Sequence, residues 1–186
     1  MRVVSIALIL LLPAALSATP TMGIFFDNPP TLLYKTPAPF EQFRAYVVGE
    51  GINCFLDAAE FSMTVPAGLV IMAYTVPQGS LTLGFPASGI SITYWPPMDG
   101  WNPGYNLLCT VDFLFLGDGC WCPYGGTSAD LILEIVPHPD SEGILGSCWP
   151  ENYLFHFTGL HSFVCPSSLC MGTEETSWGA IKSLYR

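Results

Sequence analysis

Four residues near the end of the chain have side-chain types and spacing that could form a zinc site. They are His156, His161, Cys165 and Cys170. Structural zinc is held by imidazole nitrogens and thiolates at comparable spacings, and Cys120 and Cys122 provide further thiols upstream. In exported proteins, however, thiols are usually oxidised to disulfides. We therefore expect these cysteines to form disulfides, and we predict no resident metal.

Cysteines are numerous in this chain, and their number is odd. The seven are Cys54, Cys109, Cys120, Cys122, Cys148, Cys165 and Cys170. If six form a disulfide framework, the seventh stays free or forms an intermolecular disulfide with a partner. The sequence leaves the pairing open. Cys54 and Cys109 both lie in expected strands and could be joined across the core, and Cys165 and Cys170 could close a local loop.

Residues suited to hydrolytic catalysis are present, but no motif brings them together. The three histidines are His138, His156 and His161, and neither Gly-x-Ser-x-Gly nor His-Glu-x-x-His occurs in the sequence. Asp112 could pair with Asp118 or Glu134, as two carboxyl groups do in glycosidases. Such pairs carry little weight when they are drawn from fifteen scattered acidic residues. We predict that the protein is not an enzyme.

Aromatic residues crowd one proline-rich segment, residues 94–105. They are Tyr94, Trp95, Trp101 and Tyr105. Flat rings exposed on a β-sandwich can stack on sugar rings, so this segment is a candidate carbohydrate-binding site. The competing interpretation, which we favour, is that the rings cover one end of the core.

Calcium is the one cofactor for which the sequence offers a weak indication. Asp99-Gly100 and Asp118-Gly119 lie in expected loops, where exported β-sandwiches can present oxygen ligands to calcium. Aspartate followed by glycine is more typical of a plain turn. We therefore predict no required cofactor.

The N-terminus has the organisation of a secretory signal peptide. A basic Arg2 precedes an apolar run over residues 3–12, and small residues follow Pro13. We expect cleavage after Ser17, or after Ala18 as the second choice; the alternative is a retained membrane anchor. After cleavage, residues 18–171 would form a single domain without a membrane span.

Short extended segments separated by glycine and proline make up the rest of the chain. The sequence contains 18 glycines and 17 prolines, a pattern typical of many strands joined by turns. We expect strands at residues 22–26, 43–48, 54–65, 69–76, 80–85, 89–94, 106–116, 130–136, 144–148 and 153–158.

Alternation of apolar and polar residues indicates how these strands pack. Phe61, Met63 and Val65 share one face of their strand, with polar residues between them. The same period places Leu107, Cys109, Val111, Phe113 and Phe115 on one face of a later strand. Two antiparallel sheets packed face to face satisfy this pattern best. We therefore predict an all-β, two-sheet antiparallel β-sandwich, with a closed barrel as the alternative.

The charge of the chain is strongly negative, with 15 acidic and 5 basic residues and a net charge of −10. Binding to a phosphate backbone needs clustered lysine and arginine, so nucleic acid is not an expected partner. Scattered acidic residues favour a well-solvated surface outside the cell.

The last segment, residues 172–186, differs in kind from the strands. It could form a short helix, because acids lie near its start and Lys182 and Arg186 near its end. Trp178, Ile181 and Tyr185 would then share one face. We hypothesise that Trp178, Ile181, Lys182, Tyr185 and Arg186 form a sorting or surface-attachment signal. The alternative is a helix that docks on the protein's own sheet.

Three blocks of the sequence resemble a known family. They are residues 22–27 (Met-Gly-Ile-Phe-Phe-Asp), residues 58–68, and residues 178–186, a Trp-Gly-x-Ile-Lys-x-Leu-Tyr-Arg ending. The chain is similar to exported, cohesin-like β-sandwich proteins of poorly characterised environmental bacteria. The resemblance implies a cohesin-like or immunoglobulin-like sandwich and an extracellular address, but no established activity.

These observations together favour a secreted, non-enzymatic protein with an adhesive or scaffolding role. Its partner would be another protein in an extracellular or cell-surface assembly. The alternative is a carbohydrate-binding module that uses Trp95 and Trp101 on a surface glycan. Because one sandwich fold supports many functions, the fold prediction does not choose between them.

Overall fold

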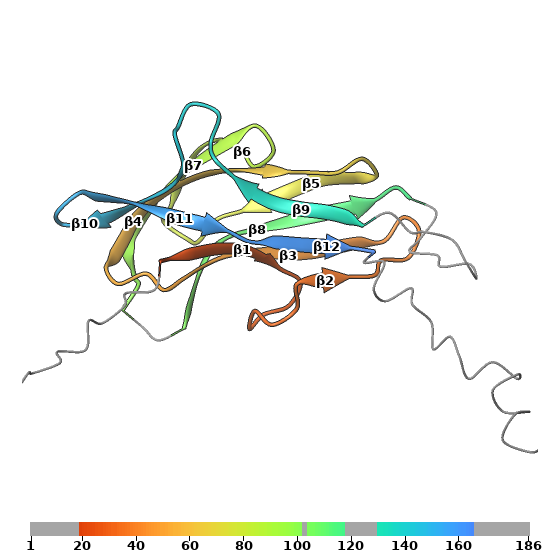
Figure 1. Ribbon diagram of the computed structural model, residues 1–186, viewed down its shortest axis with the longest axis horizontal. Coiled ribbons are helices and arrows are strands. Elements are labelled where there is room, and N and C mark those ends of the chain that lie inside the picture. The colour runs from red at the N-terminus through yellow and green to blue at the C-terminus, as the bar shows by residue number, and fades with distance from the viewer. Residues whose placement is uncertain (1–18, 102–103, 118–129, 166–186) are drawn as a thin grey trace, which may run out of the picture.

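The computed structural model describes residues 19–101, 104–117 and 130–165, which form strands and connecting turns (Figure 1). The strands are β1 (Thr21–Phe25), β2 (Tyr34–Lys35), β3 (Gln42–Glu50), β4 (Phe55–Thr64), β5 (Leu69–Thr75), β6 (Leu81–Phe85), β7 (Gly89–Asp99), β8 (Tyr105–Phe115), β9 (Leu131–Val136), β10 (Ile144–Trp149), β11 (Tyr153–Gly159) and β12 (His161–Val164). Within these residues, no helix is long and apolar enough to cross a membrane. The tail, residues 172–186, and the expected signal peptide, residues 1–17, lie outside the described part.

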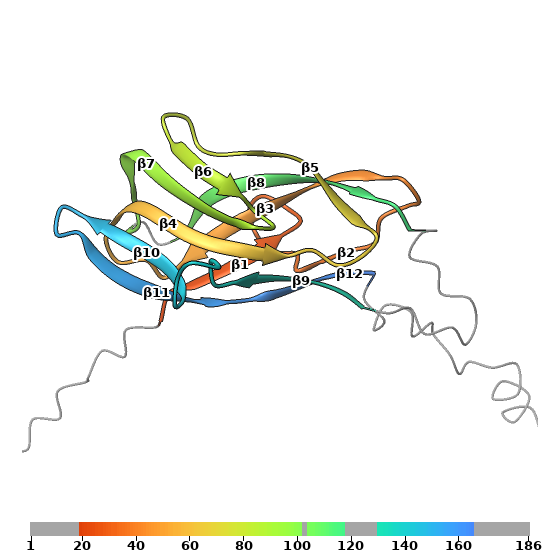
Figure 2. The same ribbon diagram turned by 90° about the horizontal axis from the view of Figure 1, so that it is seen from above.

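The strands form two layers, as the sequence predicts. One layer has the order β5-β8-β3-β1 and is antiparallel throughout. The other contains β6, β7, β4, β10 and β11, which lie side by side in Figure 2. The second half of β4 pairs with β9, which continues through β12 to β2.

The layers are joined along one edge only. There, β11 runs parallel to β1, with Thr158 opposite Thr21. At the other edge, β5 pairs only with β8 and β6 pairs only with β7. The edge strands β5 and β6 share no backbone ladder. They are connected by a side-chain hydrogen bond of 3.1 Å, which the hydroxyl of Tyr74 donates to the carbonyl of Gly84. The architecture is therefore an open β-sandwich, which excludes the closed barrel.

Alternating side chains from both layers fill the core. Phe61 and Met63 of β4 face inward, and so do Val111 and Phe113 of β8. The ring of Phe113 stacks on that of Phe43 at a centroid distance of 5.6 Å. The alternation predicted for these strands is confirmed, since successive side chains of a strand point to opposite faces.

The inner face of β8 differs from the prediction at one position. Val47 of β3 lies opposite Cys109, whereas Val48 lies opposite Leu107, so Leu108 is an extra residue in the ladder. This β-bulge turns Leu108 into the core, where it is fully buried, and leaves Leu107 half-buried. The prediction that Leu107 lies on the inner face is therefore wrong, because a bulge shifts the two-residue period by one.

The ten expected strands are all present, and two were missed. The missed strands are β2, which has two residues, and β12, which has four. The largest difference between an expected and an observed strand length is in β7, which the sequence predicts to end at Tyr94 but which continues to Asp99. A register shift in its pairing with β4 lies between Leu56 and Ala58. Pro96 and Pro97 are tolerated there, because residues in a bulge need not donate to the ladder.

Candidate functional site

A disulfide joins the start of β4 to the end of β10. Cys54 and Cys148 form it, with their Cα atoms 5.7 Å apart. The expected bridge between Cys54 and Cys109 is wrong, because Cys109 lies in β8 of the other layer and is free. Cys165 is also disulfide-bonded, which removes its thiolate from the candidate zinc set. Among the described residues, no group of three or more histidine, cysteine or acidic side chains could hold a metal ion.

The free thiol of Cys109 is inaccessible. Complete burial raises the pKa of this thiol to about 12, so it is neutral at physiological pH. Cys109 therefore cannot form the intermolecular disulfide that the sequence left open. Cys120, Cys122 and Cys170 lie outside the described residues.

We expect Cys109 to resist alkylation in the folded protein. The thiolate is the form that reacts with alkylating reagents. Because Cys109 is buried, its thiol stays protonated and the reagent cannot reach it. Treatment with iodoacetamide at pH 8, followed by peptide mass spectrometry, should show the Cys109 peptide unmodified in buffer and fully modified in guanidinium chloride. Rapid modification without denaturant would contradict the burial of β8.

The histidines and acids take part in local contacts. Ser91 donates a hydrogen bond of 3.1 Å to Glu60, while His138 Nδ1 accepts one of 3.2 Å from the amide of Asp140. The serine hydroxyl is thus directed at a carboxylate, whereas a nucleophilic serine needs a base such as histidine at its hydroxyl. Asp112 pairs with Arg44 rather than with Glu134: a hydrogen bond from Arg44 at 2.7 Å lowers the pKa of the Asp112 carboxyl group.

Within the described residues, the remaining acidic candidates and histidines lie apart from Asp112 and Glu60, at separate places on the surface. Glu134 lies 3.3 Å from the exposed His161, and His156 is exposed on β11. Asp99 accepts a hydrogen bond of 3.0 Å from the amide of Trp101, which is the geometry of a plain turn. Asp118 and Gly119 lie outside the described residues.

The four aromatic candidates do not form one surface. Tyr94 is 1% exposed and belongs to the core, where burial raises the pKa of its hydroxyl. Trp95 alternates with it and is 70% exposed, on the outer side of β7. The Tyr105 hydroxyl donates to the side chain of Asn28. Trp101, 62% exposed, lines a cleft that Trp95 does not line. Tyr94 is therefore corrected from a binding candidate to a core residue.

The outer face of the β6-β7-β4-β10-β11 layer combines exposed leucines with small side chains. Strand register aligns its outward side chains in two rows. The first row is Leu81, Thr93, Ala58, Ser147 and Leu154, and the second is Leu83, Ser91, Glu60, Leu145 and His156. We call this surface the leucine-edged face. Small side chains form its middle, and leucines stand at both sides.

A shallow groove of about 220 Å³ runs through the middle of the leucine-edged face. Its lining includes Ala58, Ser91 and Ser147, whose short side chains leave the sheet backbone close to the surface. At the sides, Leu81, Leu83 and Leu154 are 75%, 78% and 64% exposed. Large apolar side chains gathered on one exposed face are typical of interaction sites.

Sequence reasoning missed this face. Leu81, Leu83 and Phe85 alternate with Thr82 and Gly84 in β6, but this alternation does not say which face of the sheet the leucines occupy. In the structure they point outward, because β6 places them beside Thr93 and Ser91 rather than beside the buried Ile90 and Ile92. Only the register with β7 carries that information.

Comparison of the sequence with protein-family models and with curated proteins finds no match. Solved structures, by contrast, share the fold. The non-cellulosomal cohesin from the archaeon Archaeoglobus fulgidus aligns over 85% of this chain and 99% of its own, with a TM-score of 0.52 and 10% identity. A second structure is the sixth cohesin of scaffoldin B from Acetivibrio cellulolyticus, in complex with a Cel5 dockerin. It aligns over 79% of this chain and 98% of its own, with a TM-score of 0.51 and 10% identity.

A third structure is a type I cohesin–dockerin complex from Clostridium thermocellum. It aligns over 77% of this chain and 92% of its own, with a TM-score of 0.50 and 6% identity. At these identities the likeness concerns the fold, and it confirms the predicted cohesin-like β-sandwich. The C-terminal ending that contributed to the sequence resemblance lies outside the described residues.

Proposed function

We propose that the protein is a secreted, non-enzymatic adhesive or scaffolding module that binds another protein through the leucine-edged face. The observation that carries this proposal is the exposure of Leu81, Leu83 and Leu154 on the two sides of a groove with small side chains. Removing a leucine side chain from water contributes about 1.5–3 kcal/mol when its burial is complete. A partner that covers all three gains a large apolar contact.

The middle of the face favours a partner with a polar group at the centre of its contact surface. Glu60 lies between Ser91 and Leu145 in the second row and is half-buried. Its carboxylate accepts a hydrogen bond from Ser91 and lies 3.5 Å from His138. Because covering a carboxylate whose acceptor sites are only partly filled is costly, the binding protein should present a basic or other donating side chain there. The net charge of −10 also favours a partner of opposite charge.

The solved structures support a protein as the partner class. Two of the cohesins that share this fold are described in complexes with dockerins. The disulfides at Cys54–Cys148 and Cys165 support an oxidising compartment outside the cytoplasm. Together with the expected signal peptide, they favour an extracellular or cell-surface assembly.

Charged substitutions on the leucine-edged face should abolish docking without unfolding the protein. We expect Leu83→Glu and Leu154→Glu to lose the partner, because each places a carboxylate in a surface that the complex would desolvate. The measurement is co-purification from the extracellular fraction of the producing organism after mild cross-linking, with identification by mass spectrometry.

Met72→Glu is the matched control for docking. Met72 is an exposed apolar residue on β5, in the opposite layer of the sandwich, and its substitution should leave co-purification unchanged. Retention of the same partner by Leu83→Glu and Leu154→Glu would rule out the leucine-edged face as the docking surface.

A further inference from the structure

A second surface, at one end of the sandwich, has the properties of a small-ligand site. It is a cleft of about 510 Å³, a volume within the range of small-molecule sites. Strand ends from both layers meet there. The lining residues are Pro20, Gly51, Asn53, Cys54, Trp101, Cys148, Glu151, Tyr153 and Phe155.

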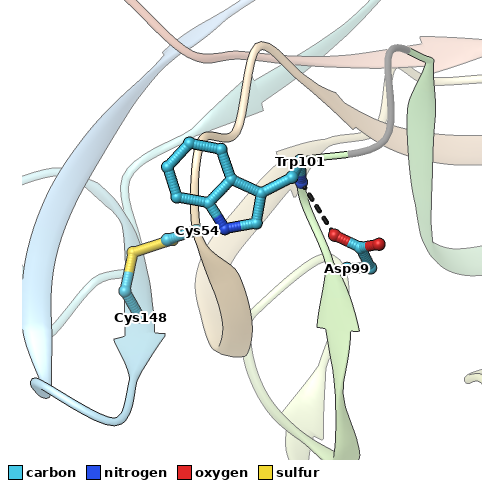
Figure 3. Close-up of a disulfide and its surroundings, with 4 residues drawn as sticks. All are labelled: Cys54, Asp99, Trp101 and Cys148. Atoms are coloured by element: carbon cyan, nitrogen blue, oxygen red, sulfur yellow. Dashed lines mark hydrogen bonds between the residues drawn. A yellow bond between two sulfur atoms is a disulfide. The ribbon is translucent and has the colours of Figure 1, made fainter.

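The cleft is built on fixed backbone. The Cys54–Cys148 disulfide forms part of its wall, and the indole of Trp101 lies beside it in Figure 3. The amide of Gly100 donates a hydrogen bond of 3.0 Å to the carbonyl of Cys54. A Cβ atom at position 100 would approach that carbonyl to 2.4 Å, so glycine is needed for this contact. The side chain of Asp99 accepts a hydrogen bond from the amide of Trp101, the next residue of this turn.

Aromatic rings form the apolar part of the cleft. Trp101 is 62% exposed and Tyr153 is 63% exposed, both unusually high for residues of their size. The rings of Tyr153 and Phe155 lie 6.5 Å apart with an angle of only 17° between their planes. Because they are two positions apart on β11, they face the same side of the strand. Two of the rings, those of Tyr153 and Phe155, are thus held by β11, while Trp101 lies in the turn that follows β7.

Polar groups lie beside these rings. Asn53 and Glu151 are exposed residues of the lining, and each offers oxygen acceptors, with the amide of Asn53 also a donor. Among the described residues, the lining contains no lysine, arginine or histidine. This chemistry excludes anionic ligands, since Glu151 and the chain's net charge of −10 would repel them.

We propose that this cleft binds a neutral oligosaccharide. A pyranose ring whose hydroxyls are equatorial has flat C–H faces that stack on Trp101 and Tyr153, as apolar surfaces stack on aromatic rings. Its ring-edge hydroxyls bond to Glu151 and Asn53. The site is distinct from the leucine-edged face, although β11 contributes to both: Tyr153 lines the cleft, while Leu154 points to the other side.

Calorimetric titration with soluble sugars tests the proposal. The probes are cellohexaose, xylohexaose and chitohexaose, added separately to the full-length secreted protein. We expect at least one to bind, and we expect Trp101→Ala and Tyr153→Ala each to weaken its affinity about tenfold or more, the loss of one stacking ring.

Two control variants locate the binding. Trp95→Ala removes an equally exposed tryptophan that does not line the cleft, and Leu154→Glu alters only the opposite side of β11; both should bind as the parent does. Circular dichroism melting of each variant shows that it is folded. Absence of binding to all three probes would overturn the proposal. So would a parent-like affinity of both Trp101→Ala and Tyr153→Ala.

Discussion

Removing the Cys54–Cys148 disulfide is expected to lower the free energy of unfolding by about 2–5 kcal/mol. The two cysteines are 94 positions apart, so their bridge strongly restricts the unfolded chain. In the folded protein it ties β10 to β4 next to the cleft. Because a domain of this size has a total stability of about 5–15 kcal/mol, the loss is a large fraction of the whole.

The double variant Cys54→Ala/Cys148→Ala is the appropriate test, since it leaves neither half of the bridge behind as an unpaired thiol. Its melting temperature should fall by roughly 5–15 °C, measured by circular dichroism, and its urea midpoint should fall accordingly. Cys109→Ala serves as the control, because it removes a buried thiol that forms no bridge and should cost about 1 kcal/mol. Equal stability of the double variant and the parent would show that the bridge contributes nothing.

Tyr94→Ala is expected to destabilise the protein by about 3–5 kcal/mol. Tyr94 is among the largest fully buried side chains, and its hydroxyl donates a hydrogen bond of 3.4 Å to the carbonyl of Leu108 across the core. Truncation leaves a cavity and an unpaired carbonyl. The free energy of unfolding, from urea denaturation followed by fluorescence and circular dichroism, gives the size of the effect.

The adjacent tryptophan provides the contrast. Trp95→Ala should change the free energy of unfolding by less than about 0.5 kcal/mol, as is usual at exposed positions. Tyr94→Phe should cost about 1 kcal/mol, since it removes only the hydroxyl. If Tyr94→Ala and Trp95→Ala had equal effects, the assignment of Tyr94 to the core and Trp95 to the surface would be mistaken.

These two residues also show where sequence reasoning stopped. Tyr94 and Trp95 are neighbouring aromatic residues, and both were candidates for sugar binding. A strand sends successive side chains to opposite faces, so the two rings could not share one surface. Which of the two faces water depends on the register of β7 against β4 and β6, where Thr93 lies opposite Ala58 and Leu81.

The cysteine pairing also could not be predicted from the sequence, here for residues that are far apart along the chain. Seven cysteines predicted a disulfide framework, and at Cys54–Cys148 the structure contains such a bridge. Their partners could not be predicted, because pairing depends on which strands are neighbours. In the described part of the chain, five strands lie between the neighbours β4 and β10 in sequence.

The sequence alone determined that the chain folds as layered β-structure with a shared apolar core. It could do so because side-chain alternation is a local property, which Phe61 and Met63 display without reference to any other strand. Only the tertiary structure decided which leucines face water, which cysteines meet and that Trp101 joins Tyr153 in one cleft. Those facts depend on strand order and register, which arise when segments distant in sequence pair with one another.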